Sequence, residues 1–388
     1  MNFATLALIV GVGLLGPLLA WSDRLRVPVV IGELAAGVLV GTTGFRLVDT
    51  GSDGVFTFLA NMGFAMVMFV AGSHVPIRDK SLRQGARPSL MRLLLVIVIA
   101  TGLAWLVARL FGTGHFALYA VLFASSSAAV ILPIAQSLRL PDTSMVRLLP
   151  QVAVADTACI VALPLALDPA NAGAAALGAL AVIGCSGVAF ALMWLSEKRG
   201  WRRALHEKSK QRDFAMELRI SLLLLLLLAA LAQTTRVSIM LAGFGLGLAV
   251  AAVGEPHRLA SQLFGLTEGL FGPIFFVWLG ASLNLRALGS HPSMILLGVV
   301  LAAGTVLAHA AAGLLKQPLS LAVMASAQLG LPVAAATLGD QLGLLKPGED
   351  AALLLGALLT IVATTVAGRL AARPPQSTGR PTAPPAQL

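Results

Sequence analysis

The sequence has little charge. Asp, Glu, Lys and Arg make up only 11% of its 388 residues, whereas soluble domains carry about 25%. Hydrophobic residues account for 57% of the chain, so there are too few polar side chains to cover a surface that faces water. The composition therefore excludes a soluble globular protein and predicts a polytopic membrane protein, in which lipid surrounds most of the chain.

Cysteine is scarce and several diagnostic motifs are absent. The two cysteines, Cys159 and Cys185, lie in apolar runs, which excludes a disulfide scaffold and a cysteine-rich zinc site. The sequence contains no GxxxxGKS/T, HExxH, GxGD or TVGYG motif. These absences exclude nucleotide hydrolysis, intramembrane proteolysis and a potassium-channel filter. We expect neither an enzyme nor a bound cofactor.

Apolar runs bounded by charge, Pro or Gly fill most of the chain. Only helices or closed barrels satisfy backbone polar groups in lipid, and these runs are too long and too rich in leucine for barrel strands. We therefore predict an all-α membrane protein with about thirteen transmembrane helices. The runs cover residues 2–21, 27–45, 55–77, 89–111, 115–138, 147–168, 172–196, 214–234, 237–253, 263–285, 291–315, 317–338 and 350–371.

The charged loops predict how the chain is oriented. Basic residues gather after odd-numbered runs, above all at 78–87 and 197–213, whereas the loop before the last run is mainly acidic (Asp340, Glu349 and Asp350). Because basic loops stay in the cytoplasm, we expect a cell-membrane protein with its N-terminus outside and its C-terminus inside. The net charge of +10 then faces anionic lipid and not nucleic acid.

The third and tenth runs resemble each other at an offset of 208 residues. This offset aligns Gly72 with Gly280 and, in the second and ninth runs, Gly37 with Gly245. The matched runs are seven spans apart, and an odd number of spans reverses the direction of crossing. The sequence therefore predicts two inverted repeats, which are typical of secondary transporters that bind substrate near the midplane.

Asp156 lies midway through the sixth run, between apolar residues. An ionisable group in lipid is costly, so an intramembrane acid is by default a candidate functional residue. A desolvated carboxylate can hold a proton or a cation in competition, which is the minimum chemistry of an antiporter. The alternative is a structural carboxylate paired with a neighbouring helix.

Two runs carry signs of helix interruption. The fifth run contains Ser125, Ser126 and Ser127 before Pro133, and the twelfth contains Gly330 and Pro332 near its centre. Proline removes a backbone donor, so each helix can break and expose carbonyl oxygens. Interrupted helices in corresponding halves indicate a transporter site. The alternative is a pair of ordinary kinked helices.

Other ionisable residues give weaker signals. His309, at the centre of the eleventh run, is either a proton-relay or charge-balancing group or a neutral packing residue. Glu33 either lines an entry funnel or has a structural role, and we favour the structural role. Glu217 and Glu268 lie near span ends, and His74 is expected at the interface.

Several segments of the chain resemble those of a known family. The chain resembles the monovalent cation:proton antiporters of the second branch, which include sodium/proton exchangers and the membrane domains of glutathione-gated potassium efflux proteins. The likeness covers nearly all of residues 5–370. Besides Asp156 and its surroundings, it is carried by VPVVIGELAAGVLVGTTGF (27–45), GFAMVMFVAG (63–72), ASSSAAVILPIAQSL (124–138) and GPIFFVWLGASLNL (272–285).

The resemblance implies a homodimer that works by elevator-type alternating access. In such proteins the fifth and twelfth spans are broken and cross near the ion-binding aspartate, here Asp156. A mobile core domain moves relative to a scaffold domain. The implied parts are a scaffold of residues 1–77 and 214–287, a linker helix at 172–196, an ion-translocating core of 89–168 and 291–371, and a disordered cytoplasmic tail at 374–388.

The chain departs from the family at several positions. Ala155 stands where relatives usually have Asp, Asn or Gln, and His309 where many have lysine. An apolar GLPVAA stretch replaces the acidic residue of the twelfth span. Family members carry two acids around the third span, and this chain has Asn61 and His74 at those positions. The 388 residues also show no counterpart of the soluble nucleotide-sensing domain of the potassium efflux relatives.

The sequence thus predicts exchange of protons for Na⁺ or K⁺ with Asp156 as the shared site. Ser125–Ser127, Thr157 and carbonyls of the broken helices would complete an oxygen shell for the cation, with His309 balancing charge. No metal other than the transported cation is expected. A single carboxylate favours one-for-one exchange. The alternatives are a transporter of an organic anion with the same fold, and a transport-inactive membrane sensor.

Overall fold

The computed structural model describes residues 2–21, 29–48, 54–73, 75, 80–199, 215–235, 237–254, 257–283, 288–289 and 292–372. His74, the basic segment 200–214 and the predicted tail at 374–388 lie outside the described residues.

The described part of the chain is helical and contains no β-strand. The helices of the first half are α1 (Phe3–Gly13), α2 (Leu15–Ala20), α3 (Val29–Val40), α4 (Gly54–Ser73), α5 (Lys80–Leu110), α6 (Phe116–Ala124), α7 (Ala128–Ser137), α8 (Asp142–Leu167) and α9 (Ala172–Lys198). Those of the second half are α11 (Met216–Thr234), α12 (Ile239–Val253), α13 (His257–Leu266), α14 (Gly272–Ser282), α16 (Pro292–Ala310), α17 (Leu319–Met324), α18 (Gly330–Gln341) and α19 (Glu349–Ala371). Short 3₁₀ turns follow α8 (Pro169–Asn171) and α16 (Ala311–Leu315), and a π-helical turn (Thr267–Phe271) joins α13 to α14.

The helices have the length and surface of membrane spans. Among the described residues, nine helical segments are long and apolar enough to cross a membrane, and three shorter apolar helices accompany them. Large side chains such as Val98, Leu177 and Leu223 are more than half exposed, which suits contact with lipid tails. The all-helical membrane fold is therefore confirmed. Helices overlap all thirteen predicted runs, but the number of complete crossings stays a prediction.

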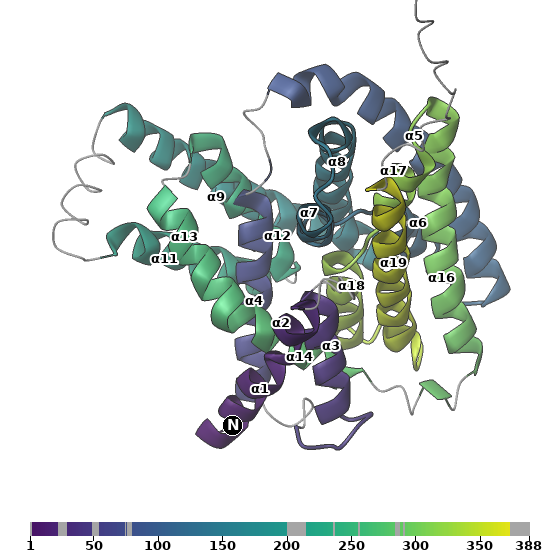
Figure 1. Cartoon of the computed structure of the whole chain (residues 1–388), viewed down its shortest axis with the longest axis horizontal. Helices are drawn as coiled ribbons and strands as arrows, with labels where there is room; N and C mark the ends of the chain where they lie inside the picture. Colours follow the sequence, from purple (N-terminus) through teal and green to yellow (C-terminus); the bar gives the residue numbers. More distant parts are fainter. Residues whose placement is uncertain are drawn as a thin grey trace, which may run out of the picture.

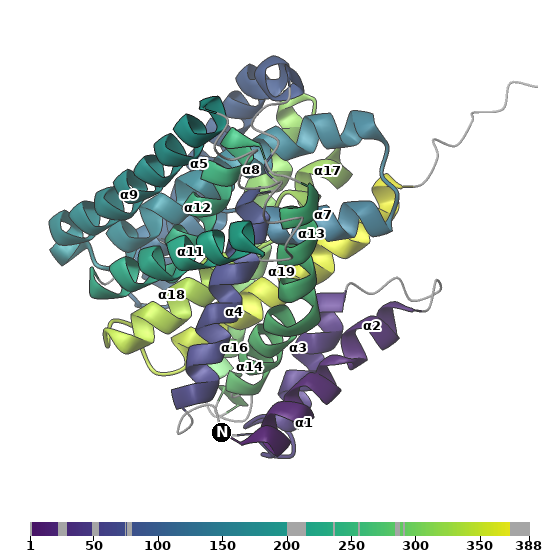
Figure 2. The same ribbon diagram turned by 90° about the vertical axis from the view of Figure 1, so that its left-hand side faces the viewer.

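The helices form two groups that meet along α7, α8 and α18. In the first group α4 packs against α12 and α14, α14 against α3, and α9 against α11 and α12. In the second, α5 packs against α6 and α8, while α16, α17 and α18 pack against α19. Figure 1 shows α9, α11 and α12 on the left and α5, α16 and α19 on the right. Figure 2 shows α1 and α2 beside α3 at the edge of the first group.

Glycines permit the closest helix contacts of the first group. A Cβ atom added to Gly37 of α3 would lie 2.2 Å from the carbonyl oxygen of Val277 on α14, and one added to Gly280 would lie 2.2 Å from that of Leu34. On the other pair, a Cβ at Gly72 of α4 would lie 2.5 Å from the carbonyl oxygen of Phe244 on α12. Small residues let helix backbones approach in this way inside membranes.

Candidate functional site

The fifth predicted span is interrupted at its three serines. Helix α6 ends at Ala124 and α7 begins at Ala128, with Ser125 in an extended conformation (φ −76°, ψ 156°). The Ser125 hydroxyl donates to the carbonyl oxygen of Leu122 at 2.8 Å. Serine side chains compete with the backbone for such bonds, which explains why the helix stops here.

The break does not lie at Pro133, where the sequence placed it. Pro133 is the sixth residue of α7, within a continuous helical segment. Proline removes only one backbone hydrogen bond, so a helix can bend and continue past it. The serine triplet is the stronger interruption, because the Ser125 hydroxyl bonds to the end of α6 and the Ser126 hydroxyl bonds to the other interrupted span.

The twelfth predicted span is interrupted between Met324 and Gly330. Helix α17 ends at Met324, and Gly330 is the first residue of α18. Pro332 lies in the first turn of α18, where a backbone N–H has no partner within the helix and proline is tolerated. Both residues therefore stand at the start of the second half-helix.

The two interruptions contact each other directly. The Ser126 hydroxyl donates to the carbonyl oxygen of Ala325 at 2.7 Å. In the opposite direction, the Gln328 amide donates to the Ser125 hydroxyl at 2.9 Å and also to the carbonyl oxygen of Leu122. All three hydrogen bonds are buried. Polar groups of the interrupted spans thus satisfy one another in the interior, away from lipid.

Asp156 lies against the beginning of α7. Its Oδ2 atom accepts a hydrogen bond of 3.1 Å from the backbone N–H of Ala128, the first residue of that helix, and the side chain is only 9% exposed. The N-terminal N–H groups and dipole of a helix stabilise negative charge. No other hydrogen bond to this carboxylate is present in the described part of the chain, so acceptor positions remain on both oxygens.

His309 reaches the same crossing from α16. Its Nε2 atom lies 3.0 Å from the carbonyl oxygen of Ser125, so Nε2 carries the hydrogen. The Nδ1 atom is buried without a partner. In the neutral ring Nδ1 is an acceptor, whereas in the charged ring it would be a second donor without an acceptor. This geometry suits a neutral histidine that supports the Ser125 carbonyl.

Thr157 and Ser127 complete the polar groups beside Asp156. The Thr157 hydroxyl donates to the carbonyl oxygen of Ala153 in its own helix at 2.8 Å. Ser127 is buried, and its carbonyl oxygen accepts the backbone N–H of Ile131 at 3.1 Å. Their hydroxyl oxygens retain lone pairs that can face a cation.

Glu33 belongs to a different part of the molecule. It is 4% exposed on α3, where a Cβ added to Gly16 of α2 would lie 2.7 Å from its Cγ. The Glu268 carboxylate of the π-helical turn lies within electrostatic range of Glu33. Helix α3 packs against α1, α2 and α14, so this placement agrees with the structural role favoured from the sequence.

Two polar groups escaped the sequence analysis. Gln328 connects three elements, because its backbone N–H also donates to the Thr360 hydroxyl of α19 at 3.2 Å. Gln328 is a polar residue inside an apolar run and lies next to a predicted break, so the sequence could have identified it as a candidate site residue. Glu349, assigned above to a loop, is the fully buried first residue of α19, and nothing in its local sequence indicates this.

Comparison with known proteins agrees with this architecture. Residues 10–372 match the family described as sodium/hydrogen exchanger, transmembrane. The probable Na⁺/H⁺ antiporter 3 of Methanocaldococcus jannaschii is 25% identical over an alignment of 361 positions that covers 88% of this chain and 89% of that protein. The glutathione-regulated potassium-efflux protein KefC of an Enterobacter species is 28% identical over an alignment of 292 positions that covers 71% of this chain and 45% of that protein.

A solved structure shares the fold. The sodium proton antiporter MjNhaP1 of Methanocaldococcus jannaschii at pH 8 superimposes with a TM-score of 0.65 at 16% identity, covering 96% of this chain and 99% of that one. The relatives are named as antiporters, which are transporters, so the expectation that this protein is not an enzyme is confirmed. With a match that extends over residues 10–372, the chain belongs to the sodium/hydrogen exchanger family of multi-pass membrane proteins.

Proposed function

We propose that this protein exchanges protons for Na⁺ and that Asp156 is the site they share. The observation that carries the proposal is the buried Asp156 carboxylate with a single hydrogen bond, at the crossing of two interrupted helices. Family membership and the relatives named as Na⁺/H⁺ antiporters support sodium as the cation.

Competition between the two ligands would couple them. Protonated Asp156 presents one O–H and cannot act as an ionic ligand, whereas the carboxylate attracts a cation. A hard cation takes oxygen ligands, which Ser127, Thr157 and carbonyl oxygens of the breaks would provide beside Asp156. The N-terminus of α7 would stabilise the carboxylate while neither ligand is bound.

Ala155 bears on the stoichiometry. It is fully buried beside Asp156 and brings no second titratable group to the site. Within the proposal, one carboxylate alternates between one proton and one cation. Exchange would then be one-for-one and electrically neutral.

The transport cycle we propose is of the elevator type, in a homodimer. The group containing α5–α8 and α16–α19 would carry the site past a scaffold formed by α1–α4 and α11–α14, with α9 as the linker. The 208-residue offset aligns α3 with α12 and α4 with α14. The contacts of α3 with α14 and of α4 with α12 support inverted repeats, because the two contacts are equivalent under this alignment. The N-terminus would lie outside the cell membrane and the C-terminus in the cytoplasm.

Potassium is the second candidate cation. The observation that favours it is the 28% identity to a potassium-efflux protein. The described residues around Asp156 offer hydroxyl and carbonyl oxygens to either ion, so a direct measurement has to separate them.

The test is proton flux in proteoliposomes on adding Na⁺, K⁺ or Li⁺. We expect Na⁺ to trigger flux in the wild type and Asp156→Asn to abolish it. Asp168→Asn is the matched control, because Asp168 ends the same helix and caps the following turn. Flux that survives in Asp156→Asn would refute the shared site. No response to any cation, with exchange of an organic anion, would instead favour the anion transporter.

A further inference from the structure

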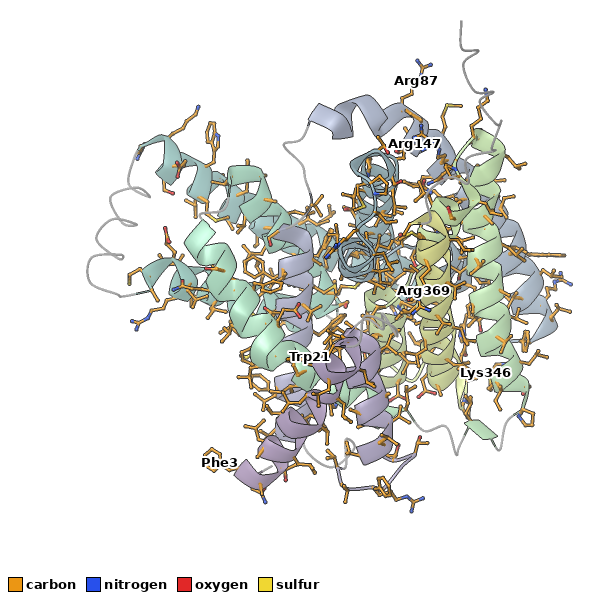
Figure 3. The ribbon with its side chains drawn as sticks, in the orientation of Figure 1. Phe3, Trp21, Arg87, Arg147, Lys346 and Arg369 are labelled. Carbon is orange, nitrogen blue, oxygen red and sulfur yellow. The ribbon has the colours of Figure 1, made fainter. Side chains whose placement is uncertain are left out.

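Two arginines meet at the contact between α5 and α8 without an acidic partner. Arg92 lies on α5 and Arg147 on α8, two helices that pack together. Their like charges are close enough to repel each other. Figure 3 shows Arg147 at the same end of the molecule as Arg87, opposite Lys346. Within the described part of the chain, neither Arg92 nor Arg147 forms an ion pair.

Within the part of the chain that the structure describes, buried polar atoms of Arg92 and Gln151 have no hydrogen-bond partner. The Nε atom of Arg92 is buried and makes no hydrogen bond. Gln151 is 1% exposed, and neither the nitrogen nor the oxygen of its amide is bonded. Gln151 follows Arg147 by four residues, which places it on the same face of α8, one turn deeper. Unsatisfied buried polar atoms are uncommon and indicate a missing ligand or water.

The part of α5 that carries Arg92 borders lipid. Leu90, Met91 and Leu94, which flank Arg92 in the sequence, are 51%, 54% and 54% exposed. They belong to a segment with the hydropathy of a membrane span. Leu90 and Leu94 lie two positions from Arg92 and therefore face away from it, so the arginines lie near the end of a helix whose other side contacts lipid.

We propose that Arg92, Arg147 and Gln151 bind the phosphate group of an anionic phospholipid. The phosphate oxygens would accept hydrogen bonds from the Arg92 Nε–H, from the Arg147 guanidinium and from the Gln151 amide, and their negative charge would relieve the repulsion between the arginines. The acyl chains would extend into the lipid that borders this part of α5. Basic pockets between membrane helices recognise lipid headgroups by this chemistry. This proposal does not depend on the transported ion.

Native mass spectrometry of the purified full-length protein with phosphatidylglycerol tests it. Each Arg→Gln change is expected to weaken binding about fivefold, so the double variant Arg92→Gln/Arg147→Gln loses about 25-fold. Arg109→Gln is the matched control, because Arg109 lies at the opposite end of α5 and stacks on Trp105. Gln151→Met, which retains both charges, is expected to lose about fivefold through its hydrogen bonds.

The outcomes separate specific recognition from general attraction. Phosphatidylcholine should bind the wild-type protein more weakly than phosphatidylglycerol does, because its choline cation offsets the charge of the phosphate. An equal loss of phosphatidylglycerol in Arg109→Gln would overturn the site, as would unchanged binding in the double variant and in Gln151→Met. Displacement of the lipid by millimolar inorganic phosphate would identify a free-anion site and also overturn the lipid assignment. None of these readouts involves transport.

Discussion

Asp156 and Glu349 are both buried carboxylates, but their hydrogen bonding is very different. Asp156 is 9% exposed and accepts one bond, from the Ala128 N–H at 3.1 Å. Glu349 is fully buried, and both its oxygens are engaged. Its Oε1 atom accepts from Tyr119 at 2.6 Å and His115 at 2.7 Å, and its Oε2 atom accepts from the Lys346 N–H at 2.9 Å.

The difference distinguishes a site that can exchange ligands from one that cannot. A carboxylate with several charge-assisted bonds is strongly held, so a proton or cation would have to displace protein partners. Asp156 has acceptor positions to spare, and a ligand can occupy them without breaking the fold. Glu349 instead joins the start of α6 to the start of α19, the helices that lead into and support the crossing.

The largest expected effect is the loss of transport in Asp156→Asn with the fold intact. The amide removes the ionic ligand but costs little stability, because only one hydrogen bond is affected. Sodium-triggered proton flux should vanish while the thermal unfolding midpoint in detergent stays within a few degrees of the wild type. A strongly lowered midpoint would mean that Asp156 is a structural acid like Glu349.

Glu349→Gln should show the reverse pattern. Replacing a carboxylate that accepts three bonds lowers the free energy of unfolding by about 1.5–3 kcal/mol. The unfolding midpoint should fall, whereas the protein that remains folded should keep the wild-type choice of cation. Asp350→Asn, the adjacent acid in the first turn of α19, is the control. If Glu349→Gln changed the cation selectivity and left the stability unchanged, Glu349 would not be a structural acid and would no longer differ in role from Asp156.

Tyr119→Phe removes one bond to Glu349 and keeps the aromatic ring. The cost should be about 1–2 kcal/mol, smaller than that of Glu349→Gln. In the double variant the two losses should be less than additive, because both act on one bond. If the losses of unfolding free energy were fully additive, Tyr119 and Glu349 would stabilise the fold independently.

Thr157→Val has the smallest expected effect. The Thr157 hydroxyl already donates to Ala153, so only its lone pairs are available to a cation. We expect the half-saturating Na⁺ concentration to rise about threefold, equivalent to part of one hydrogen bond, with no change in the maximal rate. A shift of about a hundredfold would make Thr157 a principal ligand, and an unchanged value would remove it from the shell.

Sequence reasoning predicted the membrane helices and most of the candidate site because these features are local. Apolar runs are long enough to span lipid, and an acid such as Asp156 within one run stands out without any knowledge of its neighbours. The serine triplet and the Gly330–Pro332 segment were recognisable for the same reason. The prediction of a break at Pro133 was wrong because it considered only the backbone donor that proline lacks. The break lies at Ser125 and Ser126, whose partners Ala325 and Gln328 are distant in the sequence.

The sequence by itself determined that the chain is a helical membrane protein with an acid midway along the sixth span, since composition and periodicity suffice for that. Only the tertiary structure decided how each polar group is satisfied. It placed the Asp156 carboxylate against the start of α7, joined the interruptions through Ser126 and Gln328, and buried Glu349 against His115 and Tyr119, more than 200 residues away. Such hydrogen bonds join residues far apart in the chain, and no local pattern reports where a donor will find its acceptor.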